Sequence, residues 1–314
     1  MARSLRLVVL AVALTVVACA DNGATTSPGA DATPASPSSA YPLTIRVASG
    51  PFTIDARPAR IVSLSPTATE MLFAVGAGDQ VLAVDDQSNY PPDAPTTTLS
   101  GYEPNAESIA SYEPDLVVYS NDIGDVAAAL DALGIPALLQ PAAANLRDVY
   151  EEIEQLGAVT DHTEEAAAVV SSMRSQITDI VASLPDTAEA PTYYHELDDT
   201  YYTVTSSTFI GKIYALLGLR NIADAADKDG TGYPQLSPEY ILDADPDLIF
   251  LADTKCCGQS ARTVARRPGW SQLSAVRHGA VVELDDDVAS RWGPRIVDLL
   301  RSAAATVTKI EAAA

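Results

Sequence analysis

Cysteine and histidine are the residues of this 314-residue chain with the most recognisable chemistry, and each occurs three times. Cys256 and Cys257 are adjacent, and two neighbouring thiols tend to oxidise outside the cell. The pair predicts either a vicinal disulfide, which closes a strained ring, or two free, partly buried thiols. Two cysteines are too few for a zinc site, and no CxxC spacing occurs.

The third cysteine follows a basic start and an apolar run over residues 7–18. This run is too short to cross a bilayer, so we predict a lipoprotein signal peptide over residues 1–18. The residues Val16-Val17-Ala18-Cys19 resemble a bacterial lipobox, in which the thiol receives a lipid. Residues 19–42 are rich in Ala, Thr, Ser and Pro, which predicts a flexible tether. We therefore expect an extracytoplasmic protein, anchored through Cys19 to the outer face of the cell membrane.

Of the three histidines, only His195 falls near the end of a predicted strand and so near an expected ligand site. A lone histidine at a strand end is more often a structural hydrogen-bonding group than an axial ligand. No set of His, Asp and Glu converges in the sequence, so we predict no bound metal and no cofactor.

The formal net charge of −23 argues against nucleic acid as a partner. The sequence has no GxSxG, no GxGxxG after its first strand and no phosphate-cradling loop. We therefore expect a binding protein without catalytic residues rather than an enzyme.

An internal repeat indicates how the chain is organised. Residues 105–118 and 237–250 share a cap residue, a glutamate, an isoleucine and a Pro-Asp-Leu run at one constant offset. Each copy predicts an N-cap, a short helix, a turn and a buried strand. Residues 69–76 and 211–218 form a weaker pair, each a short helix that ends on glycine. Two similar α/β halves follow.

Apolar runs alternate with helical segments in both halves, which implies parallel sheets with right-handed crossovers. Thr67 and Glu70 have the spacing of a capping box for the first helix. The predicted strands are 60–64, 81–84, 116–119 and 136–139 in the first half and 192–195, 248–251 and 281–284 in the second, with helices such as 126–133 and 294–310.

Between the halves lies a regular helical pattern of about six turns. Asp161 is the expected cap, Glu164 completes its box and Pro185 ends the helix. We interpret it as a connecting helix over residues 161–185, between lobes at 43–160 and 186–314; the alternative is an ordinary helix packed on a sheet. Its apolar positions are Ala166, Val169, Val170, Met173, Ile177, Ile180, Val181 and Leu184.

Ligands of open parallel sheets lie outside the carboxyl ends of the strands. The sequence therefore predicts a ligand cleft between the two lobes. Its expected loops are Ser65–Thr67, Tyr119–Asp122, His195–Tyr202 and Ala252–Cys257.

Five ordered motifs carry a family resemblance: residues 60–70, 88–92, 107–118, 235–239 and 293–295. From about Pro58 to the C-terminus the chain resembles the ABC-importer solute-binding proteins for cobalamin and ferric siderophores. The resemblance implies an α/β fold of two Rossmann-like lobes with parallel central sheets and one rigid connecting helix. It also implies that Glu107 and Glu239 pair with arginines on the two permease subunits. Alternatively, each acid only favours the positive N-terminus of its helix.

The implied ligand is a small molecule, either cobalamin-like or a ferric siderophore, delivered to an ABC permease and ATPase complex by a monomeric protein. Tyrosines can stack on a corrin or a catecholate ring, and Arg291 can pair with an anionic chelate. A haem-binding protein, or a sensor or adhesion lipoprotein without an importer, is the alternative. The expected ligand-binding residues are Ser65, Pro66, Thr67, Tyr90, Tyr102, Tyr202, Tyr233, Arg291 and Trp292.

Overall fold

The structure of the protein is a computed structural model, which describes residues 41–185 and 189–312. The predicted signal peptide, the lipid site at Cys19 and the tether up to residue 40 lie outside these residues. The described residues all belong to one compact unit. Within the described residues, no helix has the length and hydropathy needed to cross a membrane.

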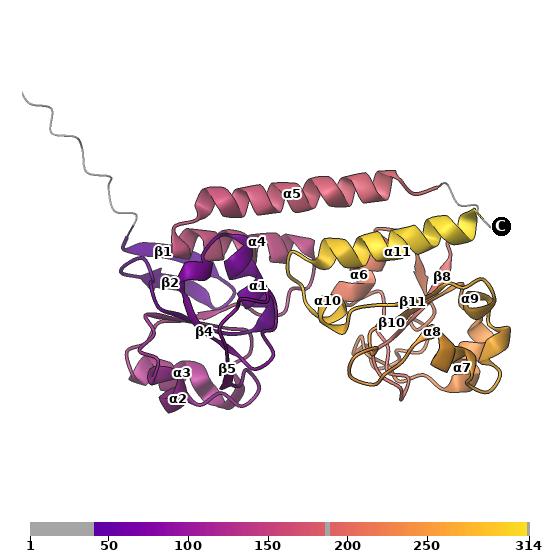
Figure 1. Cartoon of the computed structure of the whole chain (residues 1–314), viewed down its shortest axis with the longest axis horizontal. Coiled ribbons are helices and arrows are strands. Elements are labelled where there is room, and N and C mark those ends of the chain that lie inside the picture. The colour runs from indigo at the N-terminus through magenta and orange to yellow at the C-terminus, as the bar shows by residue number, and fades with distance from the viewer. Residues whose placement is uncertain (1–40, 186–188, 313–314) are drawn as a thin grey trace, which may run out of the picture. The chain divides into compact units, whose positions relative to one another are not determined.

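Two separate parallel sheets form the centres of two lobes, as predicted (Figure 1). The first has the order β5-β4-β3-β6-β7 and the second the order β11-β10-β8-β9. The strands of the first are β3 (Ile61–Leu64), β4 (Val81–Asp85), β5 (Thr96–Leu99), β6 (Leu116–Tyr119) and β7 (Ala137–Leu139). Those of the second are β8 (Thr192–Glu196), β9 (Arg220–Asn221), β10 (Leu248–Leu251) and β11 (Val281–Glu283).

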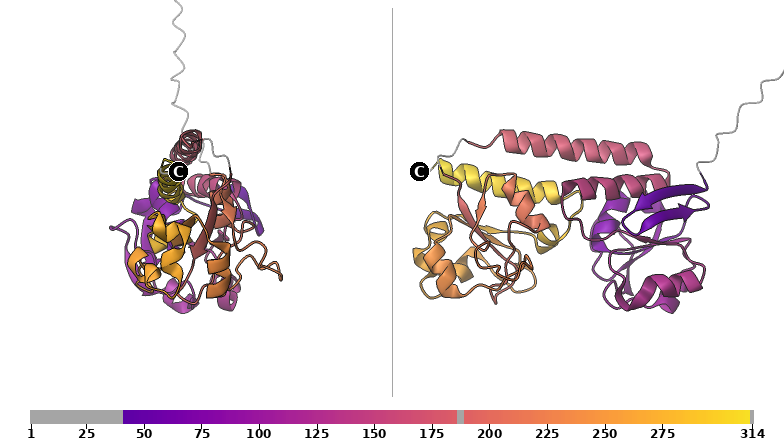
Figure 2. Two further views of the ribbon diagram at one scale, coloured as in Figure 1. Left: turned by 90° about the vertical axis from the view of Figure 1, so that its right-hand side faces the viewer. Right: turned by 180° about the vertical axis from the view of Figure 1, so that it is seen from behind.

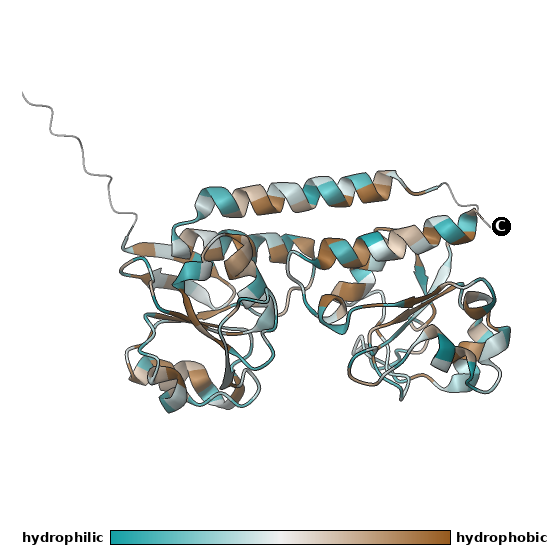
Figure 3. Cartoon of the chain, viewed as in Figure 1, coloured by the Kyte–Doolittle hydropathy of each residue, from teal (hydrophilic) through white to brown (hydrophobic). Residues whose placement is uncertain are grey.

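The central strands are short apolar runs because helices cover both faces of each sheet. Every residue of β3, β6 and β10 is buried. Figure 3 shows hydrophobic ribbon concentrated on the strands inside each lobe. Each of the seven predicted strands therefore matches an observed one closely, since a buried parallel strand is the feature that an apolar run indicates most directly. The edge strands β5 and β9 were not predicted.

Eleven α-helices lie within the described residues, together with three short 3₁₀ turns at Gly78–Gln80, Ile123–Asp125 and Trp270–Gln272. The first lobe contains α1 (Pro66–Ala74), α2 (Ala106–Ala110), α3 (Val126–Ala132) and α4 (Leu146–Thr160). Next comes α5 (Thr163–Ala182), followed by α6 (Phe209–Ala215), α7 (Pro238–Ala244), α8 (Ala261–Ala265), α9 (Ser274–Arg277), α10 (Asp286–Ser290) and α11 (Ile296–Glu311). An antiparallel hairpin, β1 (Leu43–Val47) with β2 (Gly50–Ile54), precedes the first sheet.

The long helix α5 spans 20 residues and packs along α4 of the first lobe and α11 of the second (Figures 1 and 2). One core of buried apolar side chains runs from the first lobe through these helices into the second. The long helix between two lobes is thus confirmed, whereas the exact limits of the lobes stay a prediction.

The buried stripe on α5 is narrower than predicted. Ala166, Val170, Met173 and Ile177 are buried, but Val181 is exposed. The reason is that α5 rests on α4 and α11 along one side only and leaves its outer side to solvent (Figure 2). Four positions at helical spacing are enough for such a contact.

Two predicted helix caps were wrong. Asp161 does not begin α5 but ends α4, with a left-handed φ of 65°, and His162 takes the N-cap position of α5 without a side-chain cap bond. The turn is tight because Gly157 lies against Ala166, and a Cβ atom at Gly157 would overlap with the Ala166 methyl group. The second wrong prediction is the cap of α1, where Ser65 and not Thr67 is the N-cap residue.

Candidate ligand-binding site

The strand order of the first sheet reverses between β3 and β6, where ligands of open α/β sheets bind. Ser65 follows β3, and its side-chain oxygen caps α1 by accepting the N–H of Ala68. Ser120 follows β6 and donates its hydroxyl to Ser65 Oγ over 2.6 Å. Pro66 occupies the first turn of α1, where its missing N–H costs nothing. Ser65 is therefore the N-cap residue of α1 in place of the predicted Thr67. The Glu70 carboxylate binds Arg291 and Arg295 instead of completing a capping box.

At this point lies a pocket of about 240 Å³ that side chains of both lobes line. Small-molecule sites typically measure about 300–1,000 Å³, so a macrocyclic chelate requires the pocket to widen. The lining residues are Leu64, Ser65, Pro66, Thr67, Asp85, Gln87, Gly101, Tyr102, Ser120 and Asn121 from the first lobe and Asp287, Ser290, Arg291 and Trp292 from the second.

Six of the nine predicted ligand-binding residues meet in this pocket, namely Ser65, Pro66, Thr67, Tyr102, Arg291 and Trp292. The other three do not line it. Tyr90 lies in a neighbouring hollow, where the Arg295 guanidinium is 4.1 Å from the centre of its ring. Tyr202 and Tyr233 are 43% and 50% exposed.

Three protein groups hold the Arg291 guanidinium. Its Nη1 donates to Glu70 Oε1 over 2.8 Å, and its Nη2 donates to Asp287 Oδ1 over 2.8 Å and to the Gln87 carbonyl over 3.0 Å. Arg295 also pairs with Glu70. Only 7% of the Arg291 side chain is exposed. Arg291 thus joins the lobes, and an anionic ligand would reach it only by displacing these partners.

Trp292 makes a second contact between the lobes. Its indole N–H donates to Glu152 Oε2 on α4 over 3.0 Å. Burial raises the pKa of Glu152 to about 8, although this hydrogen bond acts in the opposite direction. The carboxyl group of Glu152 is therefore largely protonated at neutral pH.

Several residues that line the pocket were not predicted. Among them, Asp85 is the one whose charge matters most for the ligand. It is 1% exposed at the end of β4, and Gln87 N–H donates to its Oδ1 over 3.2 Å. Burial raises its pKa. A Cβ atom at Gly101 would lie 2.8 Å from Asp85 Oδ2 and 2.6 Å from the Leu64 carbonyl oxygen, so only glycine fits there. Asp85 directly follows the predicted strand 81–84, and this position could have identified it as a residue of the ligand site.

His195 does not line the pocket. It is fully buried in the second lobe, 2.9 Å from the hydroxyl of Tyr214, and burial lowers its pKa to about 3. The side chain is therefore neutral and takes part in a core hydrogen bond. Within residues 41–185 and 189–312, no group of three or more His, Cys, Asp or Glu could hold a metal ion.

The chain matches the family model described as "Periplasmic binding protein" over residues 61–288, which is more than half of the chain. The chain belongs to the periplasmic binding protein family. It is 32% identical to "Cobalamin-binding protein" of Halobacterium salinarum, over 93% of this chain and 81% of the relative. It is also 32% identical to "Uncharacterized ABC transporter substrate-binding lipoprotein YvrC" of Bacillus subtilis, over 82% of this chain and 83% of the relative.

Among solved structures, the periplasmic vitamin B12 binding protein BtuF of Vibrio cholerae is similar, with 25% identity and a TM-score of 0.65 over 80% of this chain and 97% of that chain. The predicted resemblance to ABC-importer solute-binding proteins is confirmed.

Two further surface features of this periplasmic binding protein were predicted. Glu107 and Glu239 are exposed in the first turns of α2 and α7, capped by Asn105 and Ser237. Both helices lie on the side of their lobe away from α5, and neither glutamate lines the pocket (Figure 1). Their docking role stays a prediction.

Cys256 and Cys257 are both free and exposed. The free-thiol alternative thus describes this structure, except that the thiols are not partly buried. Their oxidation in the natural environment stays a prediction.

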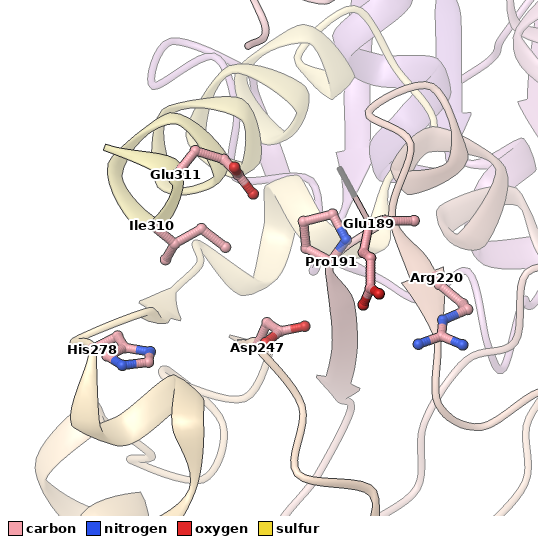
Figure 4. A pocket seen from close by; sticks show the side chains of 8 residues that line it. Glu189, Pro191, Arg220, Asp247, His278, Ile310 and Glu311 are labelled. Carbon is pink, nitrogen blue, oxygen red and sulfur yellow. The ribbon is translucent and has the colours of Figure 1, made fainter. Parts of the chain in front are cut away.

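Two other cavities are poorer candidates. One of about 270 Å³ lies where β8 and β10 begin, at the opposite ends of the strands from a typical site (Figure 4). There Asp247 accepts the N–H and the hydroxyl of Thr192, which fixes the start of β8. The other, of about 680 Å³, lies between β1 and α4 in the first lobe alone and has four acidic residues: Asp148, Glu151, Glu152 and Glu154.

Proposed function

We propose that this protein is the lipid-anchored solute-binding component of an ABC importer. It captures a cobalamin-like or iron-chelate ligand between its lobes and delivers that ligand to a permease. The pocket at the reversal point of the first sheet, lined by both lobes, is the observation that carries this proposal. The cobalamin-binding relatives support the ligand class.

The delivery step rests on Glu107 and Glu239. One exposed acid on each lobe suits a membrane partner with two equivalent subunits, because such charges steer and orient docking. Anchoring through Cys19 would keep the protein at the membrane surface after export.

Tryptophan fluorescence tests ligand capture directly. The chain has two tryptophans; Trp270 is buried in the core of the second lobe, whereas Trp292 lines the pocket. We expect cyanocobalamin or a ferric siderophore to quench the emission in a saturable way, and Trp292→Phe to remove most of the change. Tight binding of bare metal, with no response to any chelate, would contradict the proposal.

A further inference from the structure

Only three of the side chains that line the pocket within the described residues are of a type that carries a formal charge at neutral pH: Asp85, Asp287 and Arg291. Two of them already have partners of opposite charge. Arg291 is paired with Glu70 and Asp287, and Asp287 also accepts from Lys255 Nζ over 2.7 Å.

Asp85 differs from the other two. Its neighbours are Gln87, Ser88, Gly101 and the acid Asp86, and no cation contributes to its electrostatic environment. Asp85 is therefore the one of these three charged residues that has no counter-ion. Lining groups such as Ser120 and Asn121 are neutral and polar.

Among the described residues that line the pocket, the only basic side chain is Arg291, which is already paired and so is not available to an anionic ligand. Releasing Arg291 would leave the buried Glu70 carboxylate, 1% exposed, with one partner fewer. Removing a partner from a buried ion pair is strongly unfavourable. The net charge of −23 adds a long-range repulsion of anions, which salt screens more strongly than it screens the buried Asp85.

We propose that Asp85 makes the pocket select its ligand by charge: it accepts neutral or cationic metal chelates that present hydrogen-bond donors, and it rejects anionic chelates. This inference rests on the proposed capture of a chelate. It narrows the chemical class to amide-bearing neutral or cationic complexes, since amide N–H groups can donate to the Asp85 carboxylate.

Calorimetry on the purified full-length protein at pH 8 tests the selection with four probes: cyanocobalamin as the neutral chelate, ferrioxamine B as the cation, and haem and ferric enterobactin as the anions. We expect the neutral and cationic chelates to bind at least about tenfold more tightly than the anions, which is the effect of one like-charge contact in a partly buried site. The difference between cation and anions should narrow as sodium chloride is added.

The variant Asp85→Asn keeps the shape of the side chain and removes its charge. Binding of the anions should strengthen about tenfold, binding of the cation should weaken, and binding of cyanocobalamin should change little. Asp86→Asn is the matched control, since Asp86 is the next residue, is exposed and does not line the pocket. An equal effect of both variants would assign the selection to the total charge of the protein and overturn the role of Asp85.

The two proposals fail in different ways. Tighter binding of either anion than of cyanocobalamin and ferrioxamine B would overturn charge selection and leave the capture of a chelate intact. No binding of any probe would contradict the proposed function itself. If Asp85→Asn does not fold, the unmodified protein still tests the role of Asp85. A preference for the cation that persists at high salt supports the buried carboxylate, whereas a preference that salt abolishes belongs to the net charge of the protein and overturns the role of Asp85.

Discussion

Glu70 joins two parts of the chain that lie more than two hundred residues apart in sequence. It is on α1 and buried, and its carboxylate accepts from Arg291 and Arg295 of the second lobe. The spacing of Glu70 to Thr67 is equally compatible with a capping box. Sequence alone therefore cannot find this contact, because the two arginines are distant in the chain and belong to the other lobe.

Glu70→Gln should destabilise the protein by about 3–5 kcal/mol, the usual effect of removing one partner from a buried ion pair. Urea denaturation of the variant and the unmodified protein measures this difference. Glu113→Gln is the control, because Glu113 pairs with Arg60 at the surface and such pairs contribute about 0–1 kcal/mol. A loss below about 1 kcal/mol for Glu70→Gln would mean that the contact between the lobes contributes little to stability.

Glu152 makes stability depend on pH. Its pKa in the folded protein, about 8, is higher than its ordinary value of 4.5. Between these values the folded state holds a proton that the unfolded state has lost, so the contribution of Glu152 to stability falls as pH rises, by at most about 1.4 kcal/mol per pH unit. Glu152→Gln can still accept from Trp292 and should therefore gain stability relative to the unmodified protein at pH 8 but not at pH 4.

Denaturation at these two pH values, with the exposed neighbour Glu151→Gln as the control, measures the effect. Other titrating groups are common to all three proteins and cancel in the comparison. An identical pH dependence for Glu152→Gln and Glu151→Gln would show that Glu152 is not protonated in the fold.

At the scale of elements, local signals predicted seven of the nine strands of the two parallel sheets, all except β5 and β9. They also predicted the short helices of the first lobe and two in the second, but not α8, α9 and α10. β10 is a run of Leu, Ile and Phe between turns, and α7 begins at Ser237 with Pro238 in its first turn, so each needs nothing distant to be specified. The helix α4 and the hairpin β1–β2 were not among the predicted elements. Their signals were present, since Asn145 caps α4 and Leu43, Ile45 and Val47 alternate with polar residues.

The turn between α4 and α5 shows why caps were less predictable than strands. Asp161 and Glu164 have capping-box spacing, but the preceding helix already uses Asp161 as its C-cap residue. Gly157, in the last turn of that helix, lets the start of α5 pack closely against it. The choice between the two assignments therefore depended on a contact between helices.

Gly157→Ala should destabilise the pair α4–α5 by about 1–3 kcal/mol, because the added methyl group overlaps with Ala166. Adding Ala166→Gly removes that overlap and should restore part of the loss, although glycine inside a helix costs about 1 kcal/mol. A double-mutant cycle measured by denaturation gives the coupling between the two sites. Strictly additive effects would mean that the helices separate without cost at this point.

At the scale of the molecule, the repeat predicted two like lobes, and the connecting helix predicted that they act as a unit. The core that continues through α4, α5 and α11 gives this unit a physical basis. The pocket could be predicted only in part. The loops after β3 and β6 follow from sheet topology, whereas Asp287 and Ser290 enter from α10, for which the sequence offers no equivalent rule.

The two lobes carry one predicted docking acid each, so the last prediction concerns both together. Replacing Glu107 and Glu239 by Arg should abolish uptake of the ligand by cells and leave its affinity within about twofold, because both side chains are exposed and outside the pocket. Each single reversal should give an intermediate loss of uptake. Glu165→Arg with Asp179→Arg is the matched control, since it reverses two exposed acids on α5, away from the expected docking side. Uptake that survives the double reversal, or falls equally in the control, would show that these glutamates do not orient the protein on its permease.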